Sequence, residues 1–136
     1  MYWFKSSNPL RLLAISLGFC YFWFGFLKFF PGASPAENLA KETISMLTLG
    51  IIPDSLSILL LAIWETAIGI LFLANYIKKP VLIMALIHIF LTFSPLFLLP
   101  DLAFNDAFYL PTLLGQYVAK NVVFISGFLI LLKEQY

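Results

Sequence analysis

The chain has 136 residues, of which 62% are hydrophobic and only 11% charged. Soluble domains average about 45–50% apolar and about 25% charged residues, so a water-soluble fold of this size could not hide so much apolar surface. The formal net charge is +1 and the basic residues are scattered, which excludes an electrostatic interface for nucleic acid. The composition therefore predicts an integral membrane protein whose principal partner is the lipid bilayer.

Four segments are long and apolar enough to cross a bilayer, which takes about 20 residues. They cover approximately residues 10–30, 55–77, 80–99 and 110–132. Proline or charged residues mark their ends, most sharply at Lys78-Lys79-Pro80. The first segment is longer than the apolar part of a signal peptide and no small-x-small cleavage site follows it, so we expect it to be retained. The predicted fold class is all-α, with residues 1–136 forming one domain, a transmembrane four-helix bundle.

The segment between the first two spans contains the signals of one further helix. Ser34-Pro35-Ala36-Glu37 is a capping box with proline at the first helical position, and Gly50 is a stop signal. Leu39, Met46 and Leu47 would fall near one face of that helix. We therefore expect a short amphipathic helix between the first and second spans, at the membrane surface or folded back over the bundle.

Basic residues are distributed unequally between the two ends of the predicted bundle. Those at the end that holds the termini and the middle loop are Lys5, Arg11, Lys78, Lys79 and Lys133. The two other loops contain only Lys41. The positive-inside rule then predicts that both termini are cytoplasmic and that residues 31–53 and 101–109 face outward.

Ionisable residues within the spans are candidate functional residues, because each costs about 2.5–3.5 kcal/mol on insertion and usually pairs or serves a site. Glu65, His88 and Lys120 lie near the middle of the second, third and fourth spans. Each is roughly ten residues from the outer end of its span, so their heights agree to within about one helical turn. This common depth predicts one polar cluster at the bilayer midplane, with Glu65 and Lys120 within salt-bridge distance or one water molecule of each other.

Three further polar residues are candidates for the same site. Gln116 and Asn121 accompany Lys120 on the fourth span. Lys28 lies near the outer end of the first span, on a face shared with Tyr21 and Gly25. Its long side chain can either reach the membrane interface or point into the mouth of the bundle.

The cluster allows both a structural and a functional interpretation. An ion pair of Glu65 with Lys120 could simply fix the register of two helices, although buried pairs add little net stability. A metal site is not expected, because one His and one Glu fall short of the three or four ligands that zinc requires. The single cysteine, Cys20, excludes an intrachain disulfide or a thiolate cluster, so no cofactor is expected to be built in.

Three of the predicted spans contain short motifs of glycine, aromatic and charged residues: Trp23-Phe24-Gly25-Phe26-Leu27-Lys28-Phe29 after Gly18, Trp64-Glu65 with Gly69, and Lys120-Asn121. These motifs resemble those of the DoxX-like family of small four-helix membrane proteins. The resemblance implies a four-helix bundle in the bacterial inner membrane, with family positions at Gly25, Lys28, Glu65, Gly69, Lys120 and Asn121. It also implies a redox setting, since some members are membrane subunits of thiosulfate–quinone oxidoreductases and others are partners in redox-stress complexes.

Together these features favour a membrane subunit or accessory factor of a redox system, with a midplane pocket for a quinone-like or other small apolar ligand. His88 and Lys120 would donate hydrogen bonds to a ligand oxygen, and Glu65 would relay protons. One alternative is a non-enzymatic assembly protein that binds a protein partner or forms a homo-oligomer. Another is a small proton or solute carrier that uses the same cluster, and whether the chain is an enzyme stays open.

Overall fold

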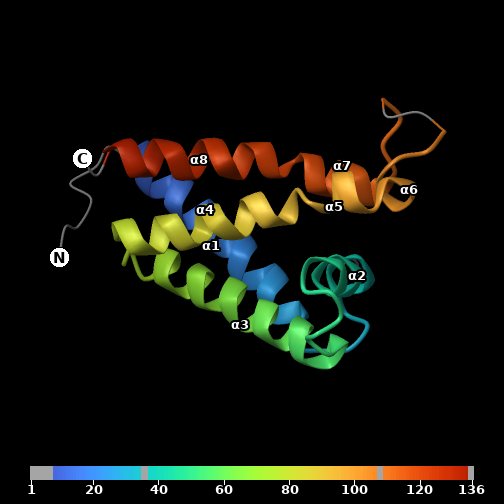
Figure 1. Cartoon of the computed structure of the whole chain (residues 1–136). Coiled ribbons are helices and arrows are strands. Elements are labelled where there is room, and N and C mark those ends of the chain that lie inside the picture. The colour runs from blue at the N-terminus through green and yellow to red at the C-terminus, as the bar shows by residue number, and fades with distance from the viewer. Residues whose placement is uncertain (1–7, 35–36, 107–108, 135–136) are drawn as a thin grey trace.

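The computed structural model describes residues 8–34, 37–106 and 109–134, and in these ranges the regular structure is helical (Figure 1). The helices are α1 (Asn8–Leu27), α2 (Glu37–Leu47), α3 (Asp54–Leu73), α4 (Lys79–Thr92), α5 (Pro95–Leu98), α6 (Pro100–Ala103), α7 (Leu113–Ala119) and α8 (Asn121–Glu134). The predicted all-α fold class is confirmed. The start of α1 and the end of α8 lie at one end of the bundle, and α2 and α6 lie at the other (Figure 1).

In the described part of the chain, four helical stretches have the length and apolar character needed to cross a membrane. They are Pro9–Leu27, Asp54–Leu73, Lys79–Leu98 and Leu113–Glu134. Large apolar side chains cover their outer surfaces: Phe90 is 60% exposed and Val123 is 64% exposed. Apolar surface this extensive is typical of a protein that contacts lipid. The prediction of a helical membrane protein is therefore confirmed.

The ends and bends of the spans follow local backbone chemistry. The second span ends at Leu73 rather than near residue 77, because Asn75 adopts a φ of 60° and the Tyr76 N–H donates to the Leu71 carbonyl at 2.8 Å. The third span is interrupted after Thr92, because Pro95 has no N–H to continue the helix. The fourth begins after Thr112, whose hydroxyl accepts a hydrogen bond from the Gly115 N–H at 3.1 Å.

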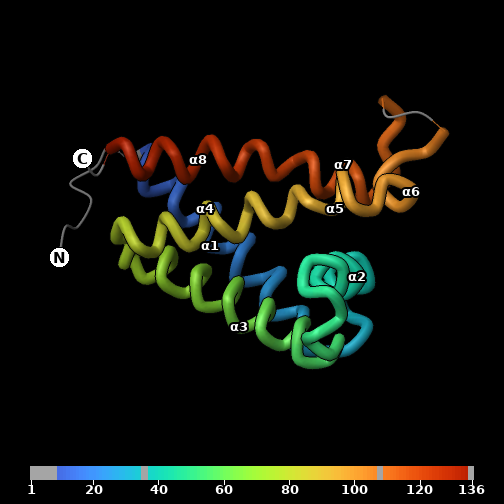
Figure 2. The backbone as a smooth tube through the Cα atoms, in the orientation of Figure 1, coloured from blue at the N-terminus to red at the C-terminus, as the bar shows by residue number. Residues whose placement is uncertain are grey.

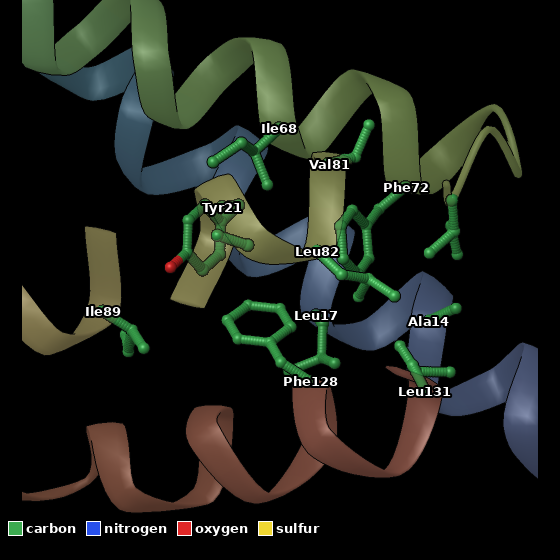
Figure 3. Packing of buried hydrophobic residues seen from close by; sticks show 12 residues of the cluster. Ala14, Leu17, Tyr21, Ile68, Phe72, Val81, Leu82, Ile89, Phe128 and Leu131 are labelled. Atoms are coloured by element: carbon green, nitrogen blue, oxygen red, sulfur yellow. The ribbon is translucent and has the colours of Figure 1, made fainter. Parts of the chain in front are cut away.

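The bundle consists of two helix pairs, α1 with α3 and α4 with α8. Glycines bring α1 and α3 together: a Cβ at Gly69 would collide with the backbone of Phe22, and one at Gly25 would lie 2.6 Å from the Thr66 nitrogen. Small residues at such positions let helix backbones approach closely in membranes. Near the end that holds the termini, the two pairs meet in an apolar core whose largest fully buried side chains are those of Phe72, Leu82, Phe128 and Leu131 (Figure 3).

Toward the opposite end α3 diverges from α4 and α5, and α2 lies across the opening, crosswise to the spans (Figure 2). Leu39 and Thr43 of α2 are buried beneath it, whereas Met46 and Leu47 are about half exposed, at 46% and 47%. The predicted short amphipathic helix between the first two spans is confirmed, and of its two predicted placements the structure shows the one over the bundle. The predicted apolar face is only partly right, because Thr43 rather than Met46 is buried beside Leu39. Two residues of its predicted capping box, Pro35 and Ala36, lie outside the described residues.

Candidate functional site

A chain of polar side chains crosses the interior of the bundle. Glu65 Oε2 accepts a hydrogen bond from Lys28 Nζ at 2.7 Å, and Glu65 Oε1 lies 2.9 Å from His88 Nε2. The other ring nitrogen, His88 Nδ1, lies 2.9 Å from the Tyr21 hydroxyl. All four residues are buried, and they join α1, α3 and α4. We call Tyr21, His88, Glu65 and Lys28 the polar chain.

The contacts of the polar chain link the tautomer of His88 to the role of the Tyr21 hydroxyl. Glu65 and Lys28 form a buried ion pair with no net charge. If the Tyr21 hydroxyl donates to Nδ1, the neutral His88 ring carries its proton on Nε2, facing Glu65 Oε1. His88 Nε2 and Glu65 Oε1 are close enough for an ion pair, but their geometry does not meet the angle required for a hydrogen bond. The structure thus places an imidazole ring 2.9 Å from one oxygen of a buried carboxylate.

Local features of α1 position Lys28 in this chain. A Cβ at Gly25 would lie 2.7 Å from the Cβ of Glu65, so only glycine lets α1 approach α3 this closely. Lys28 follows one turn later, just beyond the end of α1, and its Nζ also donates to the Phe24 carbonyl at 3.3 Å. An ammonium group is favoured at a helix C-terminus, where carbonyls lack helical partners. Of the two placements predicted for Lys28, the structure shows the one inside the bundle.

The direct ion pair predicted between Glu65 and Lys120 is wrong. Lys28 and His88 take the two carboxylate oxygens, and no carboxylate within residues 8–34, 37–106 and 109–134 lies within 4.0 Å of Lys120. Equal depth does not determine which helix faces which. The glycine-mediated pairing of α1 with α3 gives Glu65 a partner on α1, whereas α8 packs mainly on α4.

Lys120 and its two predicted companions have separate environments. Asn121 donates from Nδ2 to Thr92 Oγ1 at 2.8 Å, which ties α8 to α4. Lys120 is the C-cap residue of α7 and its side chain is exposed. Gln116 is also exposed and does not line the cavity described next. The six predicted site residues thus divide into a buried group, a second group around Lys120, and Gln116 apart from both.

A cavity of about 760 Å³ lies between the two helix pairs, beneath α2. The polar chain lines it, and so do Lys120 and Asn121. Most of its wall is apolar or aromatic; residues that contribute are Phe24, Leu39, Ile44, Trp64, Tyr117 and Phe124. Small-molecule sites typically have volumes of about 300–1,000 Å³ and combine apolar walls with a few polar groups. The cavity therefore has the size and the lining of a site for a small lipophilic molecule.

Two aromatic residues of the site were not among the predicted ligand residues. Tyr21 completes the polar chain, and its only signal in the sequence is the seven-residue spacing that places it on the same face of α1 as Lys28. Trp64 packs edge-on against His88, with ring centroids 5.5 Å apart. Its indole N–H is buried and has no hydrogen-bond partner within the described residues.

No family model, curated protein or solved structure matches this chain. The DoxX-like resemblance therefore stays a prediction. Among the residues that the structure describes, no group of three His, Cys, Asp or Glu side chains is arranged to hold a metal ion. The function must accordingly be argued from the geometry of the polar chain and the cavity.

Proposed function

We propose that this chain binds a small apolar molecule with hydrogen-bonding oxygen atoms, such as a quinone, in the cavity between its helix pairs. One observation carries the proposal: a predominantly apolar cavity has a buried ion pair and a histidine in its wall. Apolar residues of similar volume usually stabilise a fold at least as well as a buried ion pair does. Ionisable groups at this depth in a membrane protein most often serve a ligand or a proton.

The chemistry of the polar chain suits a quinone. A quinone carbonyl accepts hydrogen bonds, and the Lys28 ammonium in the cavity wall has a third N–H beyond those it donates to Glu65 and to the Phe24 carbonyl. Reduction of a quinone to a quinol takes two electrons and two protons. His88 and Glu65 would pass the protons, and a partner redox protein would supply the electrons. In this proposal the chain is a membrane subunit or accessory factor of a redox system, as the DoxX-like resemblance implies.

The proposal includes a location and an orientation. The resemblance points to the bacterial inner membrane, and the distribution of basic residues puts both termini in the cytoplasm. Single cysteines at Ser45 and Asn105, in a Cys20→Ser background, should then react with an impermeant maleimide added to intact spheroplasts. A cysteine at Lys133 should react only after the membrane is opened. The reverse pattern would overturn the orientation.

A small proton or solute carrier is the alternative that uses the same residues. A carrier needs a polar path to both sides of the membrane. Between the polar chain and the end that holds the termini, the described helices instead enclose an apolar core, with Leu17, Phe72, Leu82 and Phe128 buried in it. This packing favours a binding site that is reached from one side.

Quinone binding to the purified protein tests the proposal. Decylubiquinone should quench tryptophan fluorescence of the parent in a saturable manner. Glu65→Gln should weaken binding by about tenfold or more, because it removes the carboxylate that holds the Lys28 ammonium in place, and a hydrogen bond from that charged group to the quinone contributes about 1.5–3 kcal/mol. The matched control is Glu42→Gln on the exposed face of α2, which should bind like the parent. Unchanged affinity in Glu65→Gln, at an unchanged melting temperature, would refute the site. A parent that binds no quinone would favour the assembly protein.

A further inference from the structure

The charges that line the cavity do not balance. Three charged side chains of the described residues contribute to its wall: Lys28, Glu65 and Lys120. Lys28 and Glu65 neutralise each other at 2.7 Å. Lys120 has no carboxylate within 4.0 Å in the described ranges, so the lysine and carboxylate charges of the cavity wall sum to +1.

The position of Lys120 makes an uncompensated charge costly. It lies well inside the fourth span, about 10 Å from the beginning of α7 at Leu113 for a rise of 1.5 Å per residue. An ammonium group at such depth must either extend to the interface or find an anion. The described residues place no carboxylate within 4.0 Å of it, and Lys120 lies on the cavity wall.

The helix around Lys120 presents a surface suited to an amphiphile. Tyr117, Asn121 and Phe124 are three or four residues apart, and all three line the cavity together with Lys120. Lys120 therefore shares this part of the cavity wall with two aromatic residues and with an amide that is engaged with Thr92. Lysine binds carboxylates and phosphates as a compact charge with three N–H donors.

We propose that Lys120 binds the anionic head group of an amphiphile whose apolar body occupies the cavity. The shared chemistry is a carboxylate or phosphate on an apolar chain, supplied by a free lipophilic acid or by an anionic phospholipid. The inference uses the same cavity as the proposed function and adds a charge preference to it. Of two lipophiles with the same body, the one with the anionic head binds more tightly.

Dodecanoate and dodecanol, which share one alkyl chain, test this preference in phosphatidylcholine nanodiscs at neutral pH. Isothermal titration calorimetry should show that the parent binds dodecanoate more tightly than dodecanol. Lys120→Gln should weaken dodecanoate binding by about tenfold or more and leave dodecanol binding unchanged. Lys120→Arg should retain most of the affinity for dodecanoate, and the control Lys133→Gln, at the far end of the same span and away from the cavity, should retain all of it.

Two results would overturn the inference: equal affinity of the parent for dodecanoate and dodecanol, or dodecanoate binding that survives Lys120→Gln. Nanodiscs that contain phosphatidylglycerol distinguish the two sources. Competition with dodecanoate in the parent, absent in Lys120→Gln, identifies the phospholipid as the occupant, and no competition identifies the free acid. Loss of dodecanoate binding in Lys120→Gln alone supports the inference even if the parent binds no decylubiquinone, so the proposed function and this inference can fail separately.

Discussion

The two helix pairs each contain a lysine, and the two lysines differ in burial and in ion pairing. In the pair of α1 with α3, glycines bring the backbones together and Lys28 is buried against Glu65 at 2.7 Å. In the pair that contains α8, the fourth span changes from α7 to α8 at Lys120, and this side chain is exposed to the cavity without a carboxylate partner. Close backbone packing lets one pair satisfy its charge internally, whereas the other leaves a charge available to a ligand.

The strongest expected effect is at the buried ion pair. Glu65→Leu should lower the free energy of unfolding by about 3–5 kcal/mol, because it leaves the Lys28 ammonium buried without its carboxylate. Lys28→Met combined with Glu65→Leu should recover most of that loss, since the pair is replaced by apolar side chains. Unfolding of the purified protein in increasing SDS measures both. Equal destabilisation of the single and double variants would show that Lys28 does not depend on Glu65.

The next effect concerns the packing of the two pairs. Gly69→Ala should destabilise the protein by about 1–3 kcal/mol, because the new Cβ meets the backbone of Phe22, which cannot move without displacing α1. Gly127→Ala on α8 is the matched control: its Cβ would lie 3.0 Å from a methyl group of Leu17, which can rotate away. Comparing the two variants in the same SDS titration checks this. A larger loss for Gly127→Ala would show that α1 packs more tightly on α8 than on α3.

A smaller effect is expected at the exposed lysine. Lys120→Gln should change the free energy of unfolding by less than about 1 kcal/mol, because no ion pair with a described residue is lost. Lys28→Gln, the corresponding change in the other pair, should be several times more destabilising, since it leaves the buried Glu65 carboxylate without its ammonium partner. Similar losses for the two variants would show that Lys120 also stabilises the fold directly.

The smallest effect is a pH dependence of α2. Hydrogen bonds from Lys41 and from the Gly32 N–H lower the pKa of the Glu37 carboxyl below its usual range. Because its pKa is lowered in the folded state, the ionised Glu37 carboxylate stabilises the fold at every pH above the ordinary glutamate pKa of about 4.3. This stabilisation is lost as the pH falls through the pKa that Glu37 has in the folded protein. The start of α2 should therefore loosen under acidic conditions. Accelerated labelling of a cysteine placed at Thr43 measures this, and Glu37→Gln should abolish its pH dependence.

Much of the fold could be predicted because the signals are local. The Ser34–Glu37 motif predicted α2, and proline and charged residues marked the ends of the spans. The site could be predicted only in part. Depth along the chain identified His88 as a neighbour of Glu65, which the 2.9 Å contact confirms, but the same reasoning paired Glu65 with the wrong lysine. Depth fixes the height of a residue in the bundle and leaves open which neighbouring helix it faces.

The sequence by itself determined that this chain spans a membrane with four helices and carries ionisable residues at a common depth, because hydropathy and helical rise depend only on residue identity and spacing. The tertiary structure alone decided that Lys28 neutralises Glu65, that Tyr21 joins His88, and that Lys120 faces a cavity. These outcomes depend on how each helix is rotated and on which helix it packs against. Two features set the rotation and the partner of each helix: the close approach of α1 to α3 that Gly25 and Gly69 permit, and the divergence of α3 from α4. Both features arise from contacts between residues far apart in the sequence.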